Sequence, residues 1–594
     1  MVISLRRLLL LLVSVLTFTS ISLATDPADP ASLFSAETSL LVEIPRPAQL
    51  VAQLVNHPLV THLQDHPLVQ QFRTSPQYAR MQAPRVMVET QLSMSAGEAV
   101  AAVLQQYVGI AVDAQRGVTL IVRGRDAELM EKVRASFLEL TRLAGPPADG
   151  QTQYQGIAVY QAGPARAAVV RDWLVVTTVP QQLQQTIATL LAENNESAAR
   201  SKLPLNDNLQ NCRTALGDTA DVRLMLNLAE VRRLPAVERA LQAQAPNPLV
   251  ELLLGGLQTL LQQADWLGAE FTLTEDSATL QARLPFDVSR VPGPRQWYFG
   301  EDSAGAAPLL PQLPETIVSA AFYRGASQMW LYAGDLFSER TNDQIASAET
   351  VLGTLFGGRD FGEEILGLLG PEIRLTVVRQ NPDQMQPRPS VLFPAFALVA
   401  PLHDPETMWP ELRRTFQSLA GFVNITGAQE GRPQLDFAIE EIPSGKLLTS
   451  HFVPPSESAV TDVIPVLYNF SPSVTVANGE LILSSSRDLA ASLAAALTTS
   501  PPTPAAHTAI QLSASSMQAI LQDNQSQITA NSMLEKGLTV AEAEGEFGTL
   551  MELAELFEGL SLQISSAAGQ PTLQAALTLK LAETTATPPQ ESQR

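Results

Sequence analysis

Scarce residue types exclude several kinds of site. Cys212 is the only cysteine, so the chain forms no intramolecular disulfide and no cysteine-based zinc or iron–sulfur site. Six histidines leave little material for a histidine-rich metal centre. The 38 basic residues are outnumbered by 60 acidic ones, which gives a net charge of −22. We therefore expect no nucleic-acid partner, because no net positive field is present to neutralise phosphates.

Short motifs that accompany catalysis are missing as well. Residues 357–362 do not fit the dinucleotide fingerprint, and Ser444-Gly445-Lys446 lacks the glycine spacing of a phosphate-binding loop. The sequence contains no G-x-S-x-G elbow, no H-E-x-x-H and no calcium-loop pattern. A dispersed catalytic triad leaves no such motif, so an enzyme is disfavoured but stays open. We predict no cofactor and assign no catalytic residue.

Residues 1–24 have the features of a secretory signal peptide. Arg6 and Arg7 precede an apolar stretch at residues 8–16, and Ser22-Leu23-Ala24 supplies small residues for cleavage. An uncleaved membrane anchor is the alternative, since residues 8–24 approach the length that spans a bilayer. We predict that residues 1–24 are removed and that the protein is exported, to the periplasm or to the medium.

Beyond residue 24 the sequence predicts no stable membrane span. The longest apolar run covers residues 391–402 and contains Pro394 and Pro401. Loss of Arg6 and Arg7 with the leader reduces the 38 basic residues to 36 against 60 acidic ones, a net charge of −24. This acidity disfavours adhesion to an anionic membrane surface.

Residue patterns recur in the same order along the chain, with a spacing that drifts from one match to the next. Glu37-Thr38 and the extended run 39–44 match Glu315-Thr316 and the run 317–323. The matches that follow in the same order are residues 118–140 with 396–419, 167–191 with 474–497, 222–228 with 508–512, and 279–284 with 572–577. Five ordered matches predict an internal duplication. The alternative is two unrelated domains with similar helix-capping habits.

The repeated unit has the pattern of an α+β fold. Strands at 270–274 and 279–284 follow one another directly, which requires antiparallel pairing. Alternation of Ala269, Phe271 and Leu273 places apolar residues on one face of the first strand. We predict two similar halves, each with a largely antiparallel sheet and helices packed on one face. The predicted organisation is a signal peptide at 1–24, repeats at 25–286 and 313–582, a linker at 287–312 and a disordered tail at 583–594.

Three neighbouring histidines are the candidates for a metal site. His62 and His66 are four residues apart and would face one another on a continuous helix, with His57 nearby. Pro67, however, pushes His66 out of helical geometry. The two His-Pro pairs instead place proline at the first position of a short helix. We therefore predict no metal site at these residues.

Paired acids recur where a strand passes into a helix. Asp126 precedes Glu128 by two residues, as Asp404 precedes Glu406. With Pro405 between them, Asp404 and Glu406 have the order of an N-cap, a first-turn proline and an acid favoured by the helix dipole. We predict capping rather than catalysis. His403, beside Asp404, is the place where a hydrolase with dispersed acid/base residues would be centred.

Two short segments carry a resemblance to a family. Glu43-Ile44-Pro45 with the later His57-Pro58-Leu59, and residues 468–472 before an extended run, resemble uncharacterised exported bacterial proteins that carry a domain of unknown function. The resemblance implies export and repetition. The family has no established activity, so it supplies no functional residues.

These features predict an exported envelope protein that binds a partner or acts as a scaffold. We favour a protein that is not an enzyme, with a hydrolase as the alternative. Two similar halves would enclose a cleft between them. Trp297, Tyr298 and Phe299 either line this cleft or pack the linker against one domain. The leucine-rich, aromatic-poor composition favours a small apolar ligand or an envelope protein as the partner.

Overall fold

The structure is a computed structural model that describes residues 29–57, 60, 73–74, 78, 89, 94–143, 152–192, 205–299, 309–454, 464–497, 506–566 and 572–581. The predicted leader at 1–24 and tail at 583–594 lie outside these residues. The chain divides into two compact units. Unit 1 comprises Met1–Glu238, Ala264–Pro285 and Glu583–Arg594, and unit 2 comprises Arg239–Gln263 and Phe286–Ala582.

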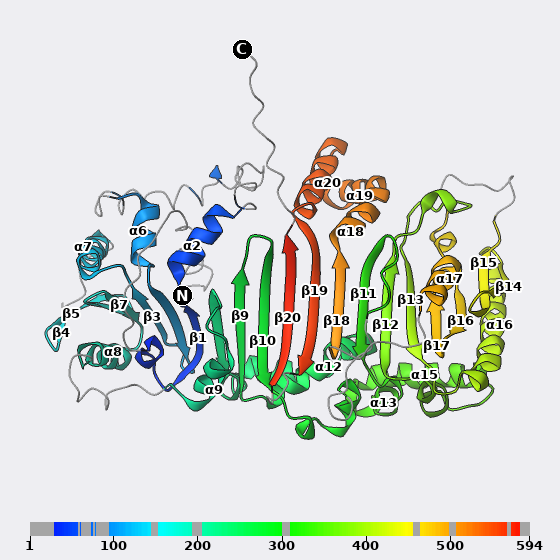
Figure 1. Ribbon diagram of the computed structural model, residues 1–594, viewed down its shortest axis with the longest axis horizontal. Coiled ribbons are helices and arrows are strands. Elements are labelled where there is room, and N and C mark those ends of the chain that lie inside the picture. Colours follow the sequence, from blue (N-terminus) through cyan, green and yellow to red (C-terminus); the bar gives the residue numbers. More distant parts are fainter. Residues whose placement is uncertain are drawn as a thin grey trace, which may run out of the picture. The chain divides into compact units, whose positions relative to one another are not determined.

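The sheet of unit 1 is antiparallel throughout. Its order is β10-β9-β8-β1-β2-β3-β7-β6-β5-β4 (Figure 1). The strands are β1 (Thr38–Ile44), β2 (Tyr107–Asp113), β3 (Val118–Arg123), β4 (Thr152–Tyr154), β5 (Ile157–Ala162), β6 (Ala165–Val170), β7 (Trp173–Thr177), β8 (Val222–Asn227), β9 (Trp266–Leu273) and β10 (Ser277–Pro285). The helices are η1 (Pro30–Leu33), α2 (Pro47–Asn56), α6 (Ala96–Val103), α7 (Ala127–Leu143), α8 (Pro180–Ala192), α9 (Asp207–Ala215) and α10 (Leu228–Val231), and α11 (Pro235–Gln242) contains the point where the chain passes to unit 2.

The sheet of unit 2 is also antiparallel throughout. Its order is β20-β19-β18-β11-β12-β13-β17-β16-β15-β14 (Figure 1). The strands are β11 (Thr316–Tyr323), β12 (Glu372–Val378), β13 (Ala395–Pro401), β14 (Leu435–Ile442), β15 (Gly445–Phe452), β16 (Ser473–Ala477), β17 (Glu480–Ser484), β18 (Thr508–Ser513), β19 (Phe557–Ser566) and β20 (Thr572–Leu581). Mixed helices and antiparallel strands confirm the predicted α+β class.

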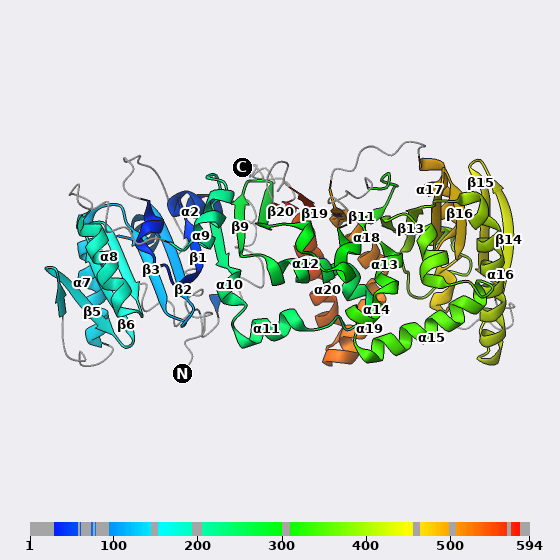
Figure 2. The ribbon, with the colours of Figure 1, turned by 90° about the horizontal axis from the view of Figure 1, so that it is seen from below.

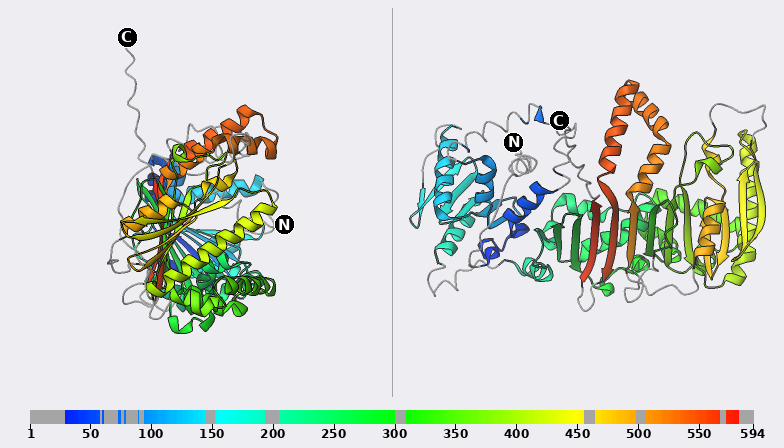
Figure 3. Two further views of the ribbon diagram at one scale, coloured as in Figure 1. Left: turned by 90° about the vertical axis from the view of Figure 1, so that its right-hand side faces the viewer. Right: turned by 45° about the horizontal axis from the view of Figure 1, so that its top comes forward.

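Helices of unit 2 lie in three places. The helices are α12 (Pro248–Gln263), η3 (Val288–Arg290), η4 (Gly293–Tyr298), α13 (Ala326–Leu331), α14 (Ala333–Leu336), α15 (Glu339–Leu355), η6 (Phe361–Ile365), η7 (Leu366–Leu368), η8 (Pro382–Gln384), α16 (Pro405–Gln429), η10 (Val466–Asn469), α17 (Arg487–Ala496), α18 (Ala514–Asp523), α19 (Gln525–Lys536) and α20 (Val540–Ala554). Helices α12, α13 and α15 lie beside the lower strand ends of Figure 1 (Figure 2), α16 and α17 cover the sheet, and α19 and α20 stand away from it (Figure 3).

Both sheets carry helices on both faces, which differs from the prediction of a single covered face. In unit 2, Ile482 packs against α17 on one face, while its neighbour Leu481 packs against α16 on the other. In unit 1, Ala168 lies in the core under α8, whereas Tyr160 belongs to the opposite face and bonds Arg134 of α7. The strands are apolar on both faces here, so both faces need cover.

Helix α12 belongs to unit 2 although the sequence analysis placed its residues in the first repeat. Glu251, fully buried, accepts from Nε of Arg295 at 3.0 Å, and Nε of Arg324 donates to the Leu252 carbonyl at 2.8 Å. A Cβ at Gly256 would lie 2.0 Å from the Tyr298 ring, so only glycine permits this close approach. These buried contacts tie the helix to η4 and β11.

The residues predicted as a linker are therefore partly folded. Trp297, Tyr298 and Phe299 are 3%, 0% and 1% exposed, and they pack inside unit 2 beside His507. Their burial means that they contribute to a core and leave no aromatic surface there for a ligand.

Candidate binding groove of the second unit

A row of polar side chains crosses five neighbouring strands of unit 2. Pairing in register places Thr376 of β12, Ser319 of β11, Gln511 of β18, Ser561 of β19 and Thr578 of β20 side by side. Residues paired in register point to the same face of a sheet. We call this set the polar row; amides and hydroxyls in such a row can donate and accept hydrogen bonds without carrying charge.

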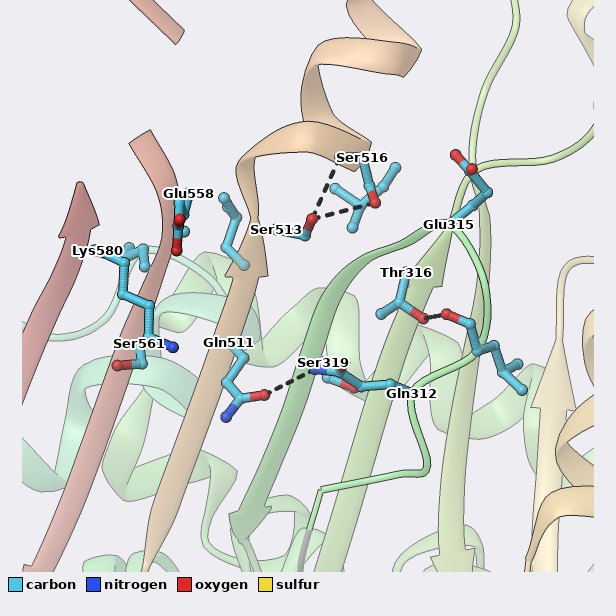
Figure 4. Close-up of a pocket in the computed structure, with 15 residues that line it drawn as sticks. Gln312, Glu315, Thr316, Ser319, Gln511, Ser513, Ser516, Glu558, Ser561 and Lys580 are labelled. Carbon is cyan, nitrogen blue, oxygen red and sulfur yellow. Dashed lines mark hydrogen bonds between the residues drawn. The ribbon is translucent and has the colours of Figure 1, made fainter. Parts of the chain in front are cut away.

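Three members of the polar row, Ser319, Gln511 and Ser561, form the floor of a cavity of about 520 Å³, the sheet hollow (Figure 4). Gln312 reaches over the floor and donates to Oε1 of Gln511 at 3.2 Å. Ser319 is 2% exposed, and its Oγ has no hydrogen-bond partner in the part of the chain that is described. An unsatisfied buried hydroxyl is costly, so a hydrogen-bonding ligand or water at this place would be favoured.

The same register positions in unit 1 are mostly apolar, and the central ones are covered by α9. The row there consists of Ala111, Leu41, Met225, Gly268 and Arg283. Leu41 and Met225 are both 0% exposed and share a core with Leu209 and Cys212 of α9. Helix α9 thus closes in unit 1 the place that is open in unit 2.

The length of one connection accounts for this difference. In unit 1, the segment 193–221 connects α8 to β8, and α9 lies within it. In unit 2 the much shorter segment 497–507 connects α17 to β18, and its positions 498–505 lie outside the described residues. The segment 497–507 is too short to hold a helix like α9 together with the residues that flank it in unit 1.

A second cavity of about 420 Å³, the loop hollow, lies where two long loops meet the first turn of α17. Phe452, Tyr468 and Phe470 contribute aromatic rings to its lining, and all three are partly exposed. Phe452 and Tyr468 lie edge to face with ring centroids 6.5 Å apart. The Tyr468 hydroxyl donates to the Val453 carbonyl at 3.2 Å, which fixes the ring.

Hydrogen bonds join the two loops into one wall. One loop spans residues 379–394 and the other spans 453–472, of which 455–463 lie outside the described residues. The Asn469 side chain accepts from the Phe393 amide and donates to the Val391 carbonyl, both at 2.8 Å. The Ser390 amide donates to the Ile464 carbonyl at 3.1 Å. A wall built this way positions its aromatic rings before any ligand arrives.

The two hollows adjoin one another, because their linings share residues, and we call them together the groove. Leu313 lines both, and a third cavity of about 530 Å³ shares Glu315 with the sheet hollow and Arg379 with the loop hollow. The groove therefore runs along one face of unit 2 from β20 to the loops.

The charged groups at the centre of the groove are paired with one another. Nε and Nη2 of Arg379 bond the two carboxylate oxygens of Asp523 at 2.6 and 2.9 Å, and Glu315 lies 3.4 Å away. The Asp523 contact raises the pKa of Arg379, so this guanidinium stays charged and occupied. Glu558 and Lys580, both exposed, lie on neighbouring strands at the other end (Figure 4). Five acidic residues against three basic ones line the groove, so it offers hydrogen bonds and aromatic surface in a mildly acidic setting.

Of the three histidines that were considered as a metal site and not predicted to form one, the structure describes His57 alone. His57 is 6% exposed at the end of α2, where its Nε2 lies 3.1 Å from the Thr274 carbonyl. His62 and His66 lie outside the described residues. Among those that the structure describes, no group of three or more His, Cys, Asp or Glu side chains could hold a metal ion.

The paired acids cap helices as predicted. Oδ1 of Asp126 accepts from the Leu129 amide at 2.8 Å, and Oδ1 of Asp404 accepts from the Thr407 amide at 3.1 Å. The hydrogen bond from Thr407 lowers the pKa of Asp404, and His403 beside it is exposed. Cys212 of α9 is buried, and this burial raises the pKa of its thiol to about 12. A thiolate at this place is therefore unfavourable.

Sequence reasoning did not find the groove. Its floor consists of polar residues on neighbouring strands, and these residues form no recognisable sequence motif. The available signal was the shortened connection before β18 and the two long loops.

Comparisons with known proteins add little to this geometry. No family model and no curated protein matches the chain. Solved structures of TP0453 overlap parts of it: crystal form III at 11% identity over 48% of this chain and 90% of that one, with a TM-score of 0.25, and crystal form IV at 13% over 43% and 81%, with a TM-score of 0.24. TM-scores this low support no argument about fold or function. Among the described residues, no helix has the length and apolarity to cross a membrane.

Proposed function

We propose that this chain is an exported, non-enzymatic binding protein of the cell envelope, and that the groove of unit 2 holds an uncharged, hydrogen-bonding ligand. The observation that carries the proposal is the polar row under an open hollow, with the unpartnered Oγ of Ser319 in its floor among the described residues. Ligand pockets combine a concave surface with a few placed hydrogen-bonding groups, so a floor of this kind is an expected place for a ligand.

The chemistry of the groove favours binding over catalysis. Proton transfer and nucleophilic attack need a titratable or activated group near the ligand. The sheet hollow is lined by amides and hydroxyls together with Glu315, Glu558 and Lys580, its described lining includes no histidine or cysteine, and Arg379 is engaged by Asp523. The hydrolase alternative centred on His403 and Asp404 gains no support, since Asp404 is occupied in capping α16.

We also propose that the two units arose by duplication of one ancestral unit. Numbered from the first strand of each unit, both sheets have the order 10-9-8-1-2-3-7-6-5-4. The first strand of each sheet has a register shift at its start, after Thr38 in one and after Thr316 in the other. Matching of the sequence with itself pairs these same two threonines.

Ligand-observed NMR on the chain without residues 1–24 tests the binding proposal. The probes are D-glucose, N-acetylglucosamine and an acetylated dipeptide amide as uncharged polar molecules, citrate and spermidine as charged ones, and N-phenyl-1-naphthylamine as an apolar one. We expect saturation transfer to at least one uncharged polar probe and none to the others.

Two variants locate the binding. Ser319→Leu and Gln511→Met install the residues of the matching positions in unit 1, and each should abolish the transfer. Gln281→Met, on an exposed strand position of unit 1, is the matched control and should leave it unchanged. Binding of the apolar probe alone, or binding that neither variant affects, would overturn the proposal.

A further inference from the structure

We infer that the groove takes a linear, uncharged oligosaccharide, whose sugar rings lie against the aromatic residues of the loop hollow while neighbouring units bond the polar row. This inference rests on the proposed function and names the ligand class of the same site. It goes further by assigning the loop hollow as a second subsite.

The aromatic residues of the loop hollow are arranged to receive flat, weakly polar surfaces. Phe452, Tyr468 and Phe470 are partly exposed, in contrast to the fully buried Tyr298 and Phe299 of the same unit. An aromatic face carries negative charge density, which attracts the partly positive C–H groups that a pyranose ring presents on its apolar side. Rings held in place by the loop wall lose little entropy when a sugar stacks on them.

Polar side chains beside the rings match the hydroxyl groups of a sugar. Gln384 and Gln386 line the loop hollow from exposed positions on the 379–394 loop. Ser486, the N-cap of α17, and Ser492, in the middle of that helix, line it as well. A carboxamide donates and accepts in one plane, and a hydroxyl does both at one atom, so these groups suit vicinal sugar hydroxyls.

The length of the groove calls for a chain of several units rather than a single ring. Two cavities of about 520 and 420 Å³ share Leu313. One sugar ring could occupy either cavity, whereas a chain of sugars could occupy both, from the polar row to Tyr468. Binding at two linked subsites raises affinity through effective concentration.

A peptide fits the same groove less well. Peptides in extended form are recognised through backbone hydrogen bonds at a free strand edge. Strands β11, β12 and β18, which carry the polar row, each have a hydrogen-bonded neighbour on both sides. Recognition there depends on side-chain amides and hydroxyls, which are complementary to a hydroxyl-rich ligand.

Calorimetric titration of the chain without residues 1–24 tests the inference. The probes are maltose, cellobiose and chitobiose, together with the hexasaccharide of each series. We expect one hexasaccharide to bind at least about tenfold more tightly than its disaccharide. Tyr468→Ala should weaken the hexasaccharide about tenfold and the disaccharide less than about twofold.

Matched variants separate loss of the ring from loss of the fold. Tyr468→Phe keeps the ring and should retain hexasaccharide affinity within about threefold. Tyr332→Ala removes a ring of unit 2 that is 38% exposed and lies outside the groove lining, and it should have no effect.

Each other outcome contradicts a defined part of the account. Disaccharide binding that depends on Gln511, with an affinity unaffected by ligand length or by the loss of the Tyr468 ring, would contradict the second subsite. The proposed function would stand in that case. If no saccharide binds while the uncharged heptapeptide acetyl-Gly-Ser-Asn-Gly-Ser-Asn-Gly amide does, the ligand class is wrong. If neither class binds, the proposed function fails as well.

Discussion

The two sheets differ at the same register positions, which are covered by a helix in unit 1 and line a cavity in unit 2. In unit 1, Leu41 and Met225 are buried under α9, while in unit 2 the matching Ser319 and Gln511 form the floor of an open cavity. Burying an apolar side chain stabilises a fold by about 1.5–3 kcal/mol, whereas a polar floor without partners costs stability. Unit 1 thus gains stability at the position where unit 2 presents hydrogen-bonding groups.

A second difference lies beside the first. Unit 1 has a cavity of about 90 Å³ near the start of α8. Its lining includes Phe34, which is fully buried, and Gln182, whose amide donates to the Leu33 carbonyl at 2.8 Å. The loop hollow near the start of α17 has about 420 Å³. Its two loops, 379–394 and 453–472, are far longer than the turns 114–117 and 163–164 between the matching strands of unit 1. Long loops in a compact domain are usually functional.

The largest effect is expected from exchanging the floor residues. Leu41→Ser should lower the stability of unit 1 by about 4 kcal/mol, since it opens a cavity and buries an unpaired hydroxyl. Ser319→Leu should change the stability of unit 2 by less than about 1 kcal/mol, because it replaces an unsatisfied hydroxyl. Hydrogen exchange of peptides from β1 and β11 measures both. Equal destabilisation of the two units would show that their floors do not differ in the way described.

Acid should weaken unit 2 through His507. Burial, with a smaller contribution from the Arg324 charge, lowers the pKa of His507 from 6.5 to about 4. A base with a lowered folded-state pKa contributes stability that is fully present above pH 6.5 and is lost as the pH falls through 4. The full contribution is about 3 kcal/mol.

Unit 1 provides the contrast for this titration. The register position of His507 is occupied there by Asp221, which accepts from the Leu273 amide at 2.8 Å. His507→Gln should remove most of the slope of unit 2 stability between pH 6.5 and 4, as followed by hydrogen exchange. An unchanged slope in this variant would assign the acid sensitivity to other groups.

A smaller effect is expected where α9 touches the sheet. A Cβ at Gly268 would lie 2.8 Å from Sγ of Cys212, and the matching residue in unit 2 is Ser561. Gly268→Ser should therefore push α9 outward at a cost of about 2 kcal/mol. Iodoacetamide labelling of Cys212 at pH 8 should be slow in the parent and faster in the variant. Gly545→Ser, where a Cβ meets nothing, is the control.

The smallest effects concern the recurring acids. Asp126→Ala and Asp404→Ala should each lower stability by about 1 kcal/mol, the usual value of an N-cap. Neither should change saccharide binding, because both carboxylates face helix amides. If either variant lost binding while its secondary structure stayed unchanged, the acid concerned would take part in function, and its assignment as a cap alone would be wrong.

The sequence allowed the strands to be located but not the cover of each sheet. Alternation at Ala269, Phe271 and Leu273 correctly placed an antiparallel strand, since period-two patterns follow directly from strand geometry. Whether a serine such as Ser319 lines a cavity, by contrast, depends on whether another segment crosses it. The spacing of the sequence matches contained this information, because the stretch 192–221 of the first half is much longer than the matching stretch 498–507.

The position of α12 could not be predicted for a related reason. Sequence order places the helix before β9, and it packs in unit 2 because Glu251, Gly256 and their partners form a buried contact. The hydrogen bonds that Arg295 and Arg324 make to this helix join segments far apart in the sequence and leave no local pattern.

Hydrogen exchange of the whole chain, with and without the saccharide panel, tests the central claim most directly. The account predicts slower exchange in peptides that cover residues 312–319, 508–516 and 466–471 when a neutral saccharide is present, with no change in peptides that cover 38–44 and 222–227. Protection confined to unit 1, or no protection at any of these strands, would contradict the claim that the open face of unit 2 is the binding site.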